Sequence, residues 1–260
     1  MEIKDYKQIN KAAWNARTEL HLTSSFYDVD AFLKSKNSLN ALELNLLGEL
    51  TAKSVLHLQC HFGQDSLSMQ QLGAQVTGVD IADNAINAAK DLAIKLGLNT
   101  QFICQDIFSY FDSNDQQFDV VYASYGTICW LPDIHRWARG VAKQLKAGGR
   151  LVFVEFHPIV DLLQGYSYFH QTSGDLEVEG TYTENSGDFK AQTQVWSHTI
   201  ADVISALASA GLTIDSLLES PLSPYPCFEE VSKSDDDIHY QWLHNGQLVP
   251  LVYAITATKL

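Results

Sequence analysis

Short apolar runs alternate with amphipathic segments through the middle of the chain. An apolar run at 55–58 leads through a loop to a helix that Gly73 ends, and a second run follows at 76–79. Asp83 or Asn84 is then expected to cap a helix that Gly97 ends. Strands that alternate with helices form parallel sheets, so the pattern predicts an α/β fold with a doubly wound, mostly parallel sheet. The expected strands are 55–58, 76–79, 101–104, 118–124, 151–156, 212–218 and 248–258.

The flanking segments have other patterns. Residues 1–50 predict two or three amphipathic helices that cap the sheet. The inward face of the first helix is expected to comprise Ile9, Ala12, Ala13 and Ala16. Later in the chain, a helix from Pro132 is expected to end at Gly148-Gly149, and the alternation from His157 to about Gln194 predicts an inserted β-hairpin or two. No repeat or linker interrupts these segments, which indicates a single domain.

A carboxylate closes the second predicted strand. Asp80 follows the run 76–79, at the position from which a carboxylate accepts hydrogen bonds from both hydroxyls of an adenosine ribose. The loop after the first strand keeps one glycine, Gly63, whereas dinucleotide-binding loops of the form G-x-G-x-x-G carry three. The stretch from Lys53 to Asp80 therefore predicts a site for an adenosine cofactor, in a loop that departs from the dinucleotide pattern.

This loop and the segments after it resemble a known family. VLHLQCHFG, residues 55–63, is similar to the VLDLGCGTG loop of class I S-adenosylmethionine-dependent methyltransferases, with His57 at the acidic position and Gln59 and His61 at two glycines. GVDIADNAINAAKDLAIKLGL, FICQDIF, FDVVYASYG and LKAGGRLVFVE resemble that family's later landmarks, in the same order. The resemblance runs from about Lys53 to about Glu155 and points to a bacterial variant with a CHFG loop in place of the usual glycine-rich loop.

The resemblance implies a fold and a division of the chain. The fold is a seven-stranded Rossmann-like sheet with a final antiparallel strand, a helical cap and a β insert. A single domain is expected over 1–260. Its parts are a cap at 1–50, a cofactor-binding half at 51–158, an insert at 159–195 and a C-terminal completion of the sheet at 196–260.

The implied cofactor is S-adenosyl-L-methionine. The residues expected to bind it are Gln59, Cys60, His61, Gly63, Asp80, Ile81, Asp106, Ile107 and Ser124. In this family Asp106 and Ile107 stand at the adenine position; the alternative is that Asp106 caps the turn into 108–111. Ser124 leaves the fourth strand where the reactive methyl would lie.

Methyl transfer from a sulfonium is an in-line displacement, which needs alignment and the exclusion of water more than it needs catalytic groups. His157 and His198 are candidate bases because each adjoins a predicted strand or helix end, with a structural role as the alternative. Glu155 is a candidate to orient an acceptor, with a capping or solvated carboxylate as the alternative. The candidates for the acceptor-binding wall, with core packing as the alternative, are Tyr27, Tyr125 and Trp130. We expect the cap at 14–27 and the insert at 159–194 to line the acceptor site together.

Charge and composition narrow the partners. With 17 Lys and Arg against 31 Asp and Glu, the net charge of −14 disfavours nucleic acid and phosphorylated acceptors. The four cysteines form no C-x-x-C pair and are expected to be reduced, and neither cysteines nor histidines cluster at zinc-ligand spacing. No apolar run is long enough to span a bilayer, so we expect a cytoplasmic protein, monomer or homodimer, with no membrane partner and no metal.

The prediction is a methyltransferase of a small-molecule acceptor, with oxygen or nitrogen as the methylated atom. Two alternatives stay open. A catalytically silent S-adenosylmethionine-binding protein would explain the lost glycines as decay of the site. An NAD-dependent oxidoreductase would share Asp80, but it would require the missing glycines and a Tyr-x-x-x-Lys pair that the sequence lacks.

Overall fold

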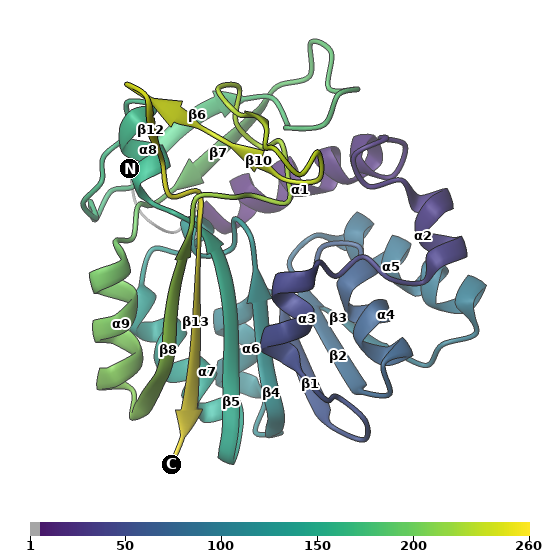
Figure 1. Ribbon diagram of the computed structural model, residues 1–260. Coiled ribbons are helices and arrows are strands. Elements are labelled where there is room, and N and C mark those ends of the chain that lie inside the picture. Colours follow the sequence, from purple (N-terminus) through teal and green to yellow (C-terminus); the bar gives the residue numbers. More distant parts are fainter. Residues whose placement is uncertain (1–5) are drawn as a thin grey trace.

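A computed structural model describes residues 6–260, in which a seven-stranded sheet is the central layer (Figure 1). Its strands run in the order β3-β2-β1-β4-β5-β13-β8. Their bounds are β1 (Ser54–Leu58), β2 (Gln75–Asp80), β3 (Gln101–Cys104), β4 (Phe118–Ser124), β5 (Leu145–Phe156), β8 (Leu212–Ser220) and β13 (Val252–Lys259). Only β13 is antiparallel to its neighbours, β5 and β8. The predicted fold class, with its final antiparallel strand, is confirmed.

Helices cover both faces of the sheet. On one face α6 (Ile107–Ser113), α7 (Ile134–Gln144) and α9 (Ile200–Ser209) pack against the strands around Trp137 and Phe153. On the other face lie α3 (Ala41–Leu47), α4 (Gln64–Gln71) and α5 (Asp83–Leu96). Strands buried on both faces carry continuous apolar runs, as the fully buried Val55 and Leu56 of β1 illustrate.

Three details of the sequence prediction are wrong. Strand β5 begins at Leu145, so Gly148 and Gly149 lie inside the strand, where its pairing with β4 shifts register. The N-cap of α5 is Ala82, and Asp83 is the first residue of the helix, where it forms an ion pair with Lys11 of α1. The first helix buries only part of the expected face: Ala13 is buried, but Ala12 is exposed, and Asn10 and Arg17 are buried instead.

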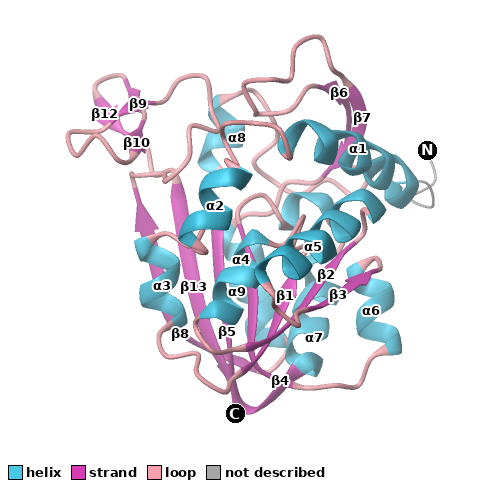
Figure 2. Ribbon diagram, turned by 90° about the vertical axis from the view of Figure 1, so that its right-hand side faces the viewer, coloured by secondary structure: helices cyan, strands magenta, loops and turns pink. Residues whose placement is uncertain are grey.

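The segments outside the sheet gather at the carboxyl ends of its strands. Figure 2 shows α1 (Tyr6–His21) beside the hairpin of β6 (Asp175–Glu179) and β7 (Ala191–Val195). Two hydrogen bonds of 2.8 Å join the Asn10 amide group to the backbone of Gln194. The insert is thus one β-hairpin preceded by α8 (Ile159–Leu163), and the cap also includes α2 (Val29–Ser35). Four two-residue strands complete this layer: β9 (Ser232–Lys233), β10 (Tyr240–Gln241), β11 (Leu243–His244) and β12 (Gln247–Leu248).

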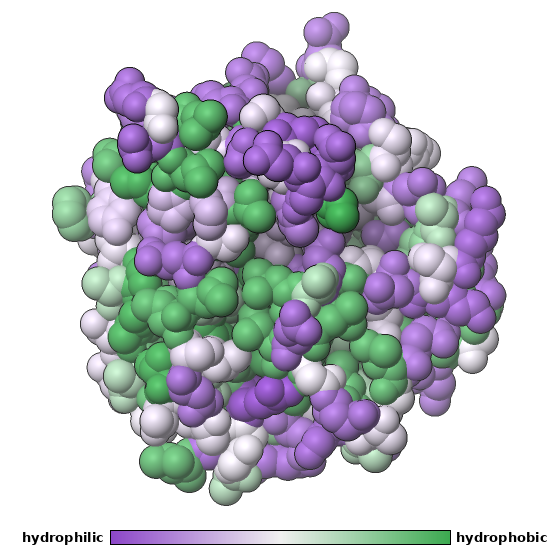
Figure 3. Space-filling view, viewed as in Figure 1, coloured by the Kyte–Doolittle hydropathy of each residue, from purple (hydrophilic) through white to green (hydrophobic). Residues whose placement is uncertain are grey.

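The surface is mostly polar around these segments and more apolar over the sheet. Figure 3 shows apolar residues gathered over β5, β8 and β13, where no helix lies in front of the strands in Figure 1. The edge strand β8 leaves Leu217 and Leu218 exposed. None of the helices within residues 6–260 has the length and apolar character needed to cross a bilayer.

Candidate functional site

A cavity of about 860 Å³ lies at the carboxyl ends of the parallel strands. Its floor is formed by the loops that follow β1, β2, β3 and β4, and its walls by α1, α2 and the insert. Ligands of open α/β sheets bind at this edge because the loops that end the strands converge there. The cap and the insert line the same cavity, as expected from the chain order.

Most of the predicted site residues meet at this cavity. All nine candidates for cofactor binding line it, and so do Tyr27, Tyr125 and Trp130. The two candidate bases do not: the ring of His157 bonds the Glu219 carboxylate, and His198 bonds the backbone oxygen of Leu131. Both histidines are buried in these contacts, which agrees with the structural alternative for each.

The loop after β1 keeps the backbone shape of a glycine-rich turn without its glycines. Gln59 has φ 52° and His61 has φ 49°, in the left-handed region that glycine adopts most easily, and Gly63 has φ 78°. The side chain of Gln59 donates to the Thr127 oxygen at 2.7 Å and so ties this loop to the one after β4. A Cβ on Gly63 would approach the Phe102 ring to 2.6 Å, which explains the one retained glycine. The substitutions preserve the turn and add side chains to it.

Asp80 is fixed by the backbone around it. One carboxylate oxygen accepts from the His61 N–H and the other from the Ala82 N–H, both at 2.8 Å. Burial raises the pKa of Asp80 to about 6, although these N–H donors oppose the rise. Each oxygen keeps acceptor capacity beyond these bonds, so the carboxylate can still receive two ligand hydroxyls.

Asp106 is the N-cap of α6, and its side chain accepts from the Ser109 N–H at 3.0 Å. The same carboxylate forms an ion pair with Lys7 of the cap. The capping alternative for Asp106 is therefore what the structure displays, while a role at adenine stays a prediction. Ile107 lies next to it on the cavity wall, nearly buried.

A chain of side chains joins the cap, the loop and the insert. His21 of α1 lies 2.8 Å from the His61 ring nitrogen and 2.6 Å from the Thr181 hydroxyl. Burial, with Arg17 nearby, lowers the pKa of His21 to about 3, and burial also holds the pKa of His61 well below its usual value. Both rings are therefore neutral near pH 7. His61 and Tyr27 line the cavity, and the His21 ring stacks on that of Tyr27.

Carboxylates collect on the side of the cavity that the insert covers. Asp161 and Glu177 both line it, and burial together with the charges of Glu155 and Glu177 raises the pKa of Asp161 to about 7. Glu155 itself is buried at the end of β5 and accepts from backbone N–H groups of the loop after β4. Its interactions position that loop, which carries Trp130 and Tyr125.

A pH-dependent stability difference is expected for Asp161→Asn. The folded protein holds a proton on Asp161 up to a pKa of about 7, against an ordinary value of 3.8, so the unfolded chain releases that proton first. The stability from this site is complete below about pH 4 and is lost as the pH rises through 7, by up to about 1.4 kcal/mol per pH unit. The variant should therefore gain stability over the wild type between pH 5 and pH 8. Urea unfolding at both pH values measures this, and a pH-independent difference would contradict it.

Three buried polar atoms on cavity-lining residues have no hydrogen-bond partner within residues 6–260: Arg17 Nε, Gln59 Oε1 and His61 Nδ1. Leaving a buried polar atom unpaired costs about 1–3 kcal/mol, so native proteins rarely do so without a reason. The three residues belong to the cap and the loop after β1, on one side of the cavity. Arg17 Nε is a donor, Gln59 Oε1 an acceptor and His61 Nδ1 either one, depending on its tautomer, and this set suits a polar, charged ligand segment.

Several residues of the site were missed by the sequence prediction. Arg17 is 3% exposed. Its position on α1 lies outside the apolar face that was expected to pack inward. Asp65 lines the cavity, accepts from the Ser38 hydroxyl at 2.5 Å and has a pKa raised by burial to about 6. Within the described part of the chain no group of three or more His, Cys, Asp or Glu is placed to hold a metal ion.

Comparisons with known proteins define the class of fold. Residues 55–149 match the model of a family described as a methyltransferase domain. A putative S-adenosylmethionine-dependent methyltransferase from Listeria monocytogenes superposes with a TM-score of 0.58 at 20% identity, covering 84% of this chain and 96% of that one. Magnesium protoporphyrin IX methyltransferase from Synechocystis, solved with bound SAH, gives 0.59 at 14% identity over 98% and 100%. The fold is that of S-adenosylmethionine-dependent methyltransferases.

Among curated proteins the similar ones include ubiquinone biosynthesis O-methyltransferases. That of Idiomarina loihiensis is 32% identical over 136 residues, which cover 51% of this chain and 56% of the relative. That of Pseudoalteromonas translucida is 25% identical over 205 residues, which cover 75% and 84%. The chain thus spans little more than half the length of the first of these relatives. The domain match and the fold agree with the resemblance to class I methyltransferases, whereas the CHFG variant stays a prediction.

Proposed function

We propose that the protein is an S-adenosylmethionine-dependent methyltransferase that methylates a small molecule. The observation that carries the proposal is the cavity in which Asp80, at the end of β2, faces the same space as the left-handed turn at Gln59 and His61. The unpaired Gln59 and His61 atoms fit a cofactor with a polar tail. The domain match over 55–149 supports the same class.

The roles proposed for the residues follow the order of the strands. Asp80 accepts the ribose hydroxyls, Asp106 and Ile107 flank the adenine, and residues 59–63 hold the amino-acid part with Ile81 on the wall between. Ser124 leaves room for the methyl group at the end of β4. When bound, S-adenosylmethionine supplies a methyl group on a sulfonium.

The residues around the acceptor would align it and exclude water. Tyr27, Tyr125 and Trp130 give this part of the cavity an aromatic lining, and the Tyr27 hydroxyl bonds that of Tyr182 in the insert. A dry, fixed wall favours an in-line displacement because it limits the positions open to the nucleophile. A hydroxyl acceptor also has to lose a proton, and Asp161 is the carboxylate placed to receive it near neutral pH.

The charged side chains that line the cavity favour an acceptor that is neutral or cationic. Lys7 and Arg17 are the cationic side chains among the described residues of the lining, and each is already paired with a carboxylate. A phosphorylated acceptor would face Asp161 and Glu177 without a free cation nearby. The name of the curated relatives favours methylation at oxygen, and an amine would suit the carboxylates equally well.

The geometry of the cavity argues against both alternatives, the catalytically silent binding protein and the NAD-dependent oxidoreductase. A decayed site would not be expected to retain non-glycine residues at positive φ in the turn, since that conformation is unfavourable for Gln59 and His61. In a dinucleotide-binding loop, glycines at these positions let the backbone approach a pyrophosphate, and here side chains fill that space.

We expect S-adenosylhomocysteine to raise the melting temperature and NADH to leave it unchanged. A ligand that binds only the folded state stabilises it by about 2.7 kcal/mol at a concentration of one hundred times its dissociation constant. Differential scanning fluorimetry with both ligands measures the shifts, with adenosine as the control for binding of the nucleoside alone. Stabilisation by NADH without stabilisation by S-adenosylhomocysteine would overturn the proposed function.

A further inference from the structure

Two carboxylates lie close together on the side of the cavity nearest α3. Glu43 of α3 is 1% exposed, and Asp65 of α4 lines the cavity. Burial raises the pKa of Asp65 to about 6, and the charge of Glu43 adds to the rise. Within residues 6–260 neither carboxylate forms an ion pair with a lysine, arginine or histidine. These two residues, the acidic corner, therefore lack a counter-charge from the described chain.

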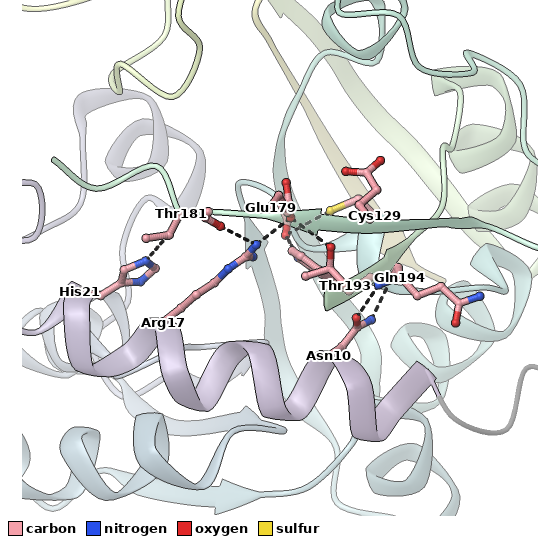
Figure 4. Close-up of polar contacts among 12 residues, drawn as sticks. Asn10, Arg17, His21, Cys129, Glu179, Thr181, Thr193 and Gln194 are labelled. Atoms are coloured by element: carbon pink, nitrogen blue, oxygen red, sulfur yellow. Dashed lines mark hydrogen bonds and ion pairs between the residues drawn. The ribbon is translucent and has the colours of Figure 1, made fainter. Parts of the chain in front are cut away.

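The cations that line the cavity are bound elsewhere. Lys7 pairs with the N-cap carboxylate of α6. Arg17 reaches from α1 to Glu179 of the insert, and Figure 4 shows it among the contacts that join the cap to the insert. Burial lowers the pKa of His57 and of His61, so these two rings of the lining are neutral near pH 7. Among the described residues of the lining no cationic side chain is left over, so a positive charge at the acidic corner would come from a ligand.

The hydrogen bonds of the acidic corner leave polar atoms unpaired. Glu43 Oε1 accepts from the Tyr125 hydroxyl, whereas the buried Glu43 Oε2 has no partner within residues 6–260. Asp65 Oδ1 accepts from the Ser38 hydroxyl at 2.5 Å, and in the same part of the chain Oδ2 accepts no hydrogen bond. The hydroxyl of Tyr122, fully buried on β4 near both carboxylates, is unpaired as well. Buried polar atoms are rarely left without a partner, so their grouping here points to a ligand.

Aromatic rings form the cavity wall beside the acidic corner. The Tyr225 ring centroid lies 5.1 Å from that of Tyr125 and 5.5 Å from that of Phe26, and all three rings line the cavity. Burial, and then the charges of Asp65 and Glu43, raise the pKa of Tyr225, so its hydroxyl lies near both carboxylates. The face of an aromatic ring attracts a cation by about 0.5–2 kcal/mol. A wall of rings suits an organic cation, whereas a metal ion would require oxygen ligands around it.

The acidic corner is separate from the positions proposed for the ribose and the adenine. Asp80 and Asp106 follow β2 and β3, whereas Tyr125 follows β4. In the order β3-β2-β1-β4, strand β1 lies between β4 and the two strands that would hold the nucleoside. A nucleoside at Asp80 would therefore leave the acidic corner to the acceptor.

We propose that the methyl acceptor carries a cationic nitrogen group, protonated or quaternary, that binds between the Asp65 carboxylate and the rings of Tyr125 and Tyr225. This inference rests on the proposed function and narrows its acceptor to organic cations. Glu43 adds its charge from behind Tyr125, whose hydroxyl it binds. A cation buried here gains two carboxylates as partners, whereas a neutral acceptor of the same shape would leave both of them uncompensated.

Two pairs of probes separate charge from shape. Choline is paired with its neutral isostere 3,3-dimethylbutan-1-ol, and protonated 2-phenylethylamine with 2-phenylethanol. In the presence of saturating S-adenosylhomocysteine, we expect the cation of at least one pair to bind about tenfold or more tightly than its neutral partner. Isothermal titration calorimetry gives the four dissociation constants, together with that of S-adenosylhomocysteine alone.

Variants locate the charge that causes this preference. Glu43→Gln keeps an acceptor for the Tyr125 hydroxyl but removes the charge, so the preference for the cation should fall to about threefold or less. Asp65→Asn should have the same effect, and it serves if the first variant does not fold. Both variants should bind S-adenosylhomocysteine within about twofold of the wild type. Glu49→Gln, at an exposed position, and Glu177→Gln, on the insert side of the cavity, are the controls and should keep the preference.

The other outcomes contradict the inference in distinguishable ways. Equal affinity for the charged and the neutral probe in both pairs would overturn it. Loss of the preference in Glu177→Gln but not in Glu43→Gln would place the cation on the insert side instead. Weaker binding of S-adenosylhomocysteine by Asp65→Asn, with the preference unchanged, would show that Asp65 meets the cofactor and not the acceptor. A wild type that does not bind S-adenosylhomocysteine would refute the proposed function itself.

Discussion

Replacing Asp80 by asparagine is expected to weaken binding of S-adenosylhomocysteine by about 10- to 100-fold. The carboxylate is held by the backbone N–H groups of His61 and Ala82, and it lines the cavity where a ribose would present its hydroxyls. Asparagine has one acceptor oxygen instead of two, so it cannot serve both backbone donors and both hydroxyls. Calorimetric titration of the variant measures the loss.

A nearby carboxylate provides the control. Asp83 lies three residues further on, pairs with Lys11 and does not line the cavity, so Asp83→Asn should leave the dissociation constant unchanged. The alanine variant of Asp80 is less suitable, because it removes the acceptor of both backbone N–H groups, whereas asparagine keeps an acceptor for one of them. An unchanged dissociation constant for Asp80→Asn would show that the ribose binds elsewhere.

Glu155→Gln is expected to lower the free energy of unfolding by about 2–4 kcal/mol, the cost of leaving buried donors without acceptors. Glu155 is 4% exposed and accepts from the backbone N–H groups of Gly126, Thr127, Ile128 and Phe156, using both carboxylate oxygens. In glutamine one of those oxygens becomes an NH₂ group that points at N–H donors. Equilibrium urea unfolding measures the change.

An exposed glutamate gives the comparison for this effect. Glu49→Gln, at a surface position whose carboxylate bonds the Thr51 N–H, should change stability by less than about 0.5 kcal/mol. A loss for Glu155→Gln as small as this would mean that the carboxylate does not hold the loop after β4. The loop, with Tyr125 and Trp130, would then need another explanation for its position.

The sheet was predictable because its strands are buried on both faces. Continuous apolar runs such as 118–124 need no knowledge of the partner to indicate a strand, and glycines such as Gly97 mark helix ends through their freedom at positive φ. The boundary at Leu145 was not predictable, since Gly148 and Gly149 ordinarily stop a helix, whereas here the strand already pairs with Phe118 of β4 at Leu145 and resumes its pairing at Arg150.

The cap was harder because its first helix buries polar side chains. Asn10, Arg17 and His21 recur at helical spacing on one face, and such a stripe ordinarily indicates a solvated surface. These residues are buried because the insert, more than 150 residues later, supplies Gln194, Glu179 and Thr181 as partners. A stripe of polar residues with a tryptophan beside it was the one signal that pointed to this face.

The conformation of the loop after β1 was also hard to predict from the sequence. Gln59 and His61 looked like losses from a glycine-rich turn, because residue type predicts backbone conformation only on average. The structure keeps the left-handed turn and uses the added side chains to bond Thr127 and His21. The turn tolerates Gln59 and His61 because their side chains contact distant segments, and a single sequence does not reveal such contacts.

The most direct test of the central claim is a crystal structure of the protein with S-adenosylhomocysteine. We expect the ribose hydroxyls on the Asp80 carboxylate, the adenine beside Ile107 and the sulfur over the loop after β1. A ligand bound outside this cavity, or one whose ribose makes no contact with Asp80, would contradict the assignment of this edge of the sheet as a methyltransferase site.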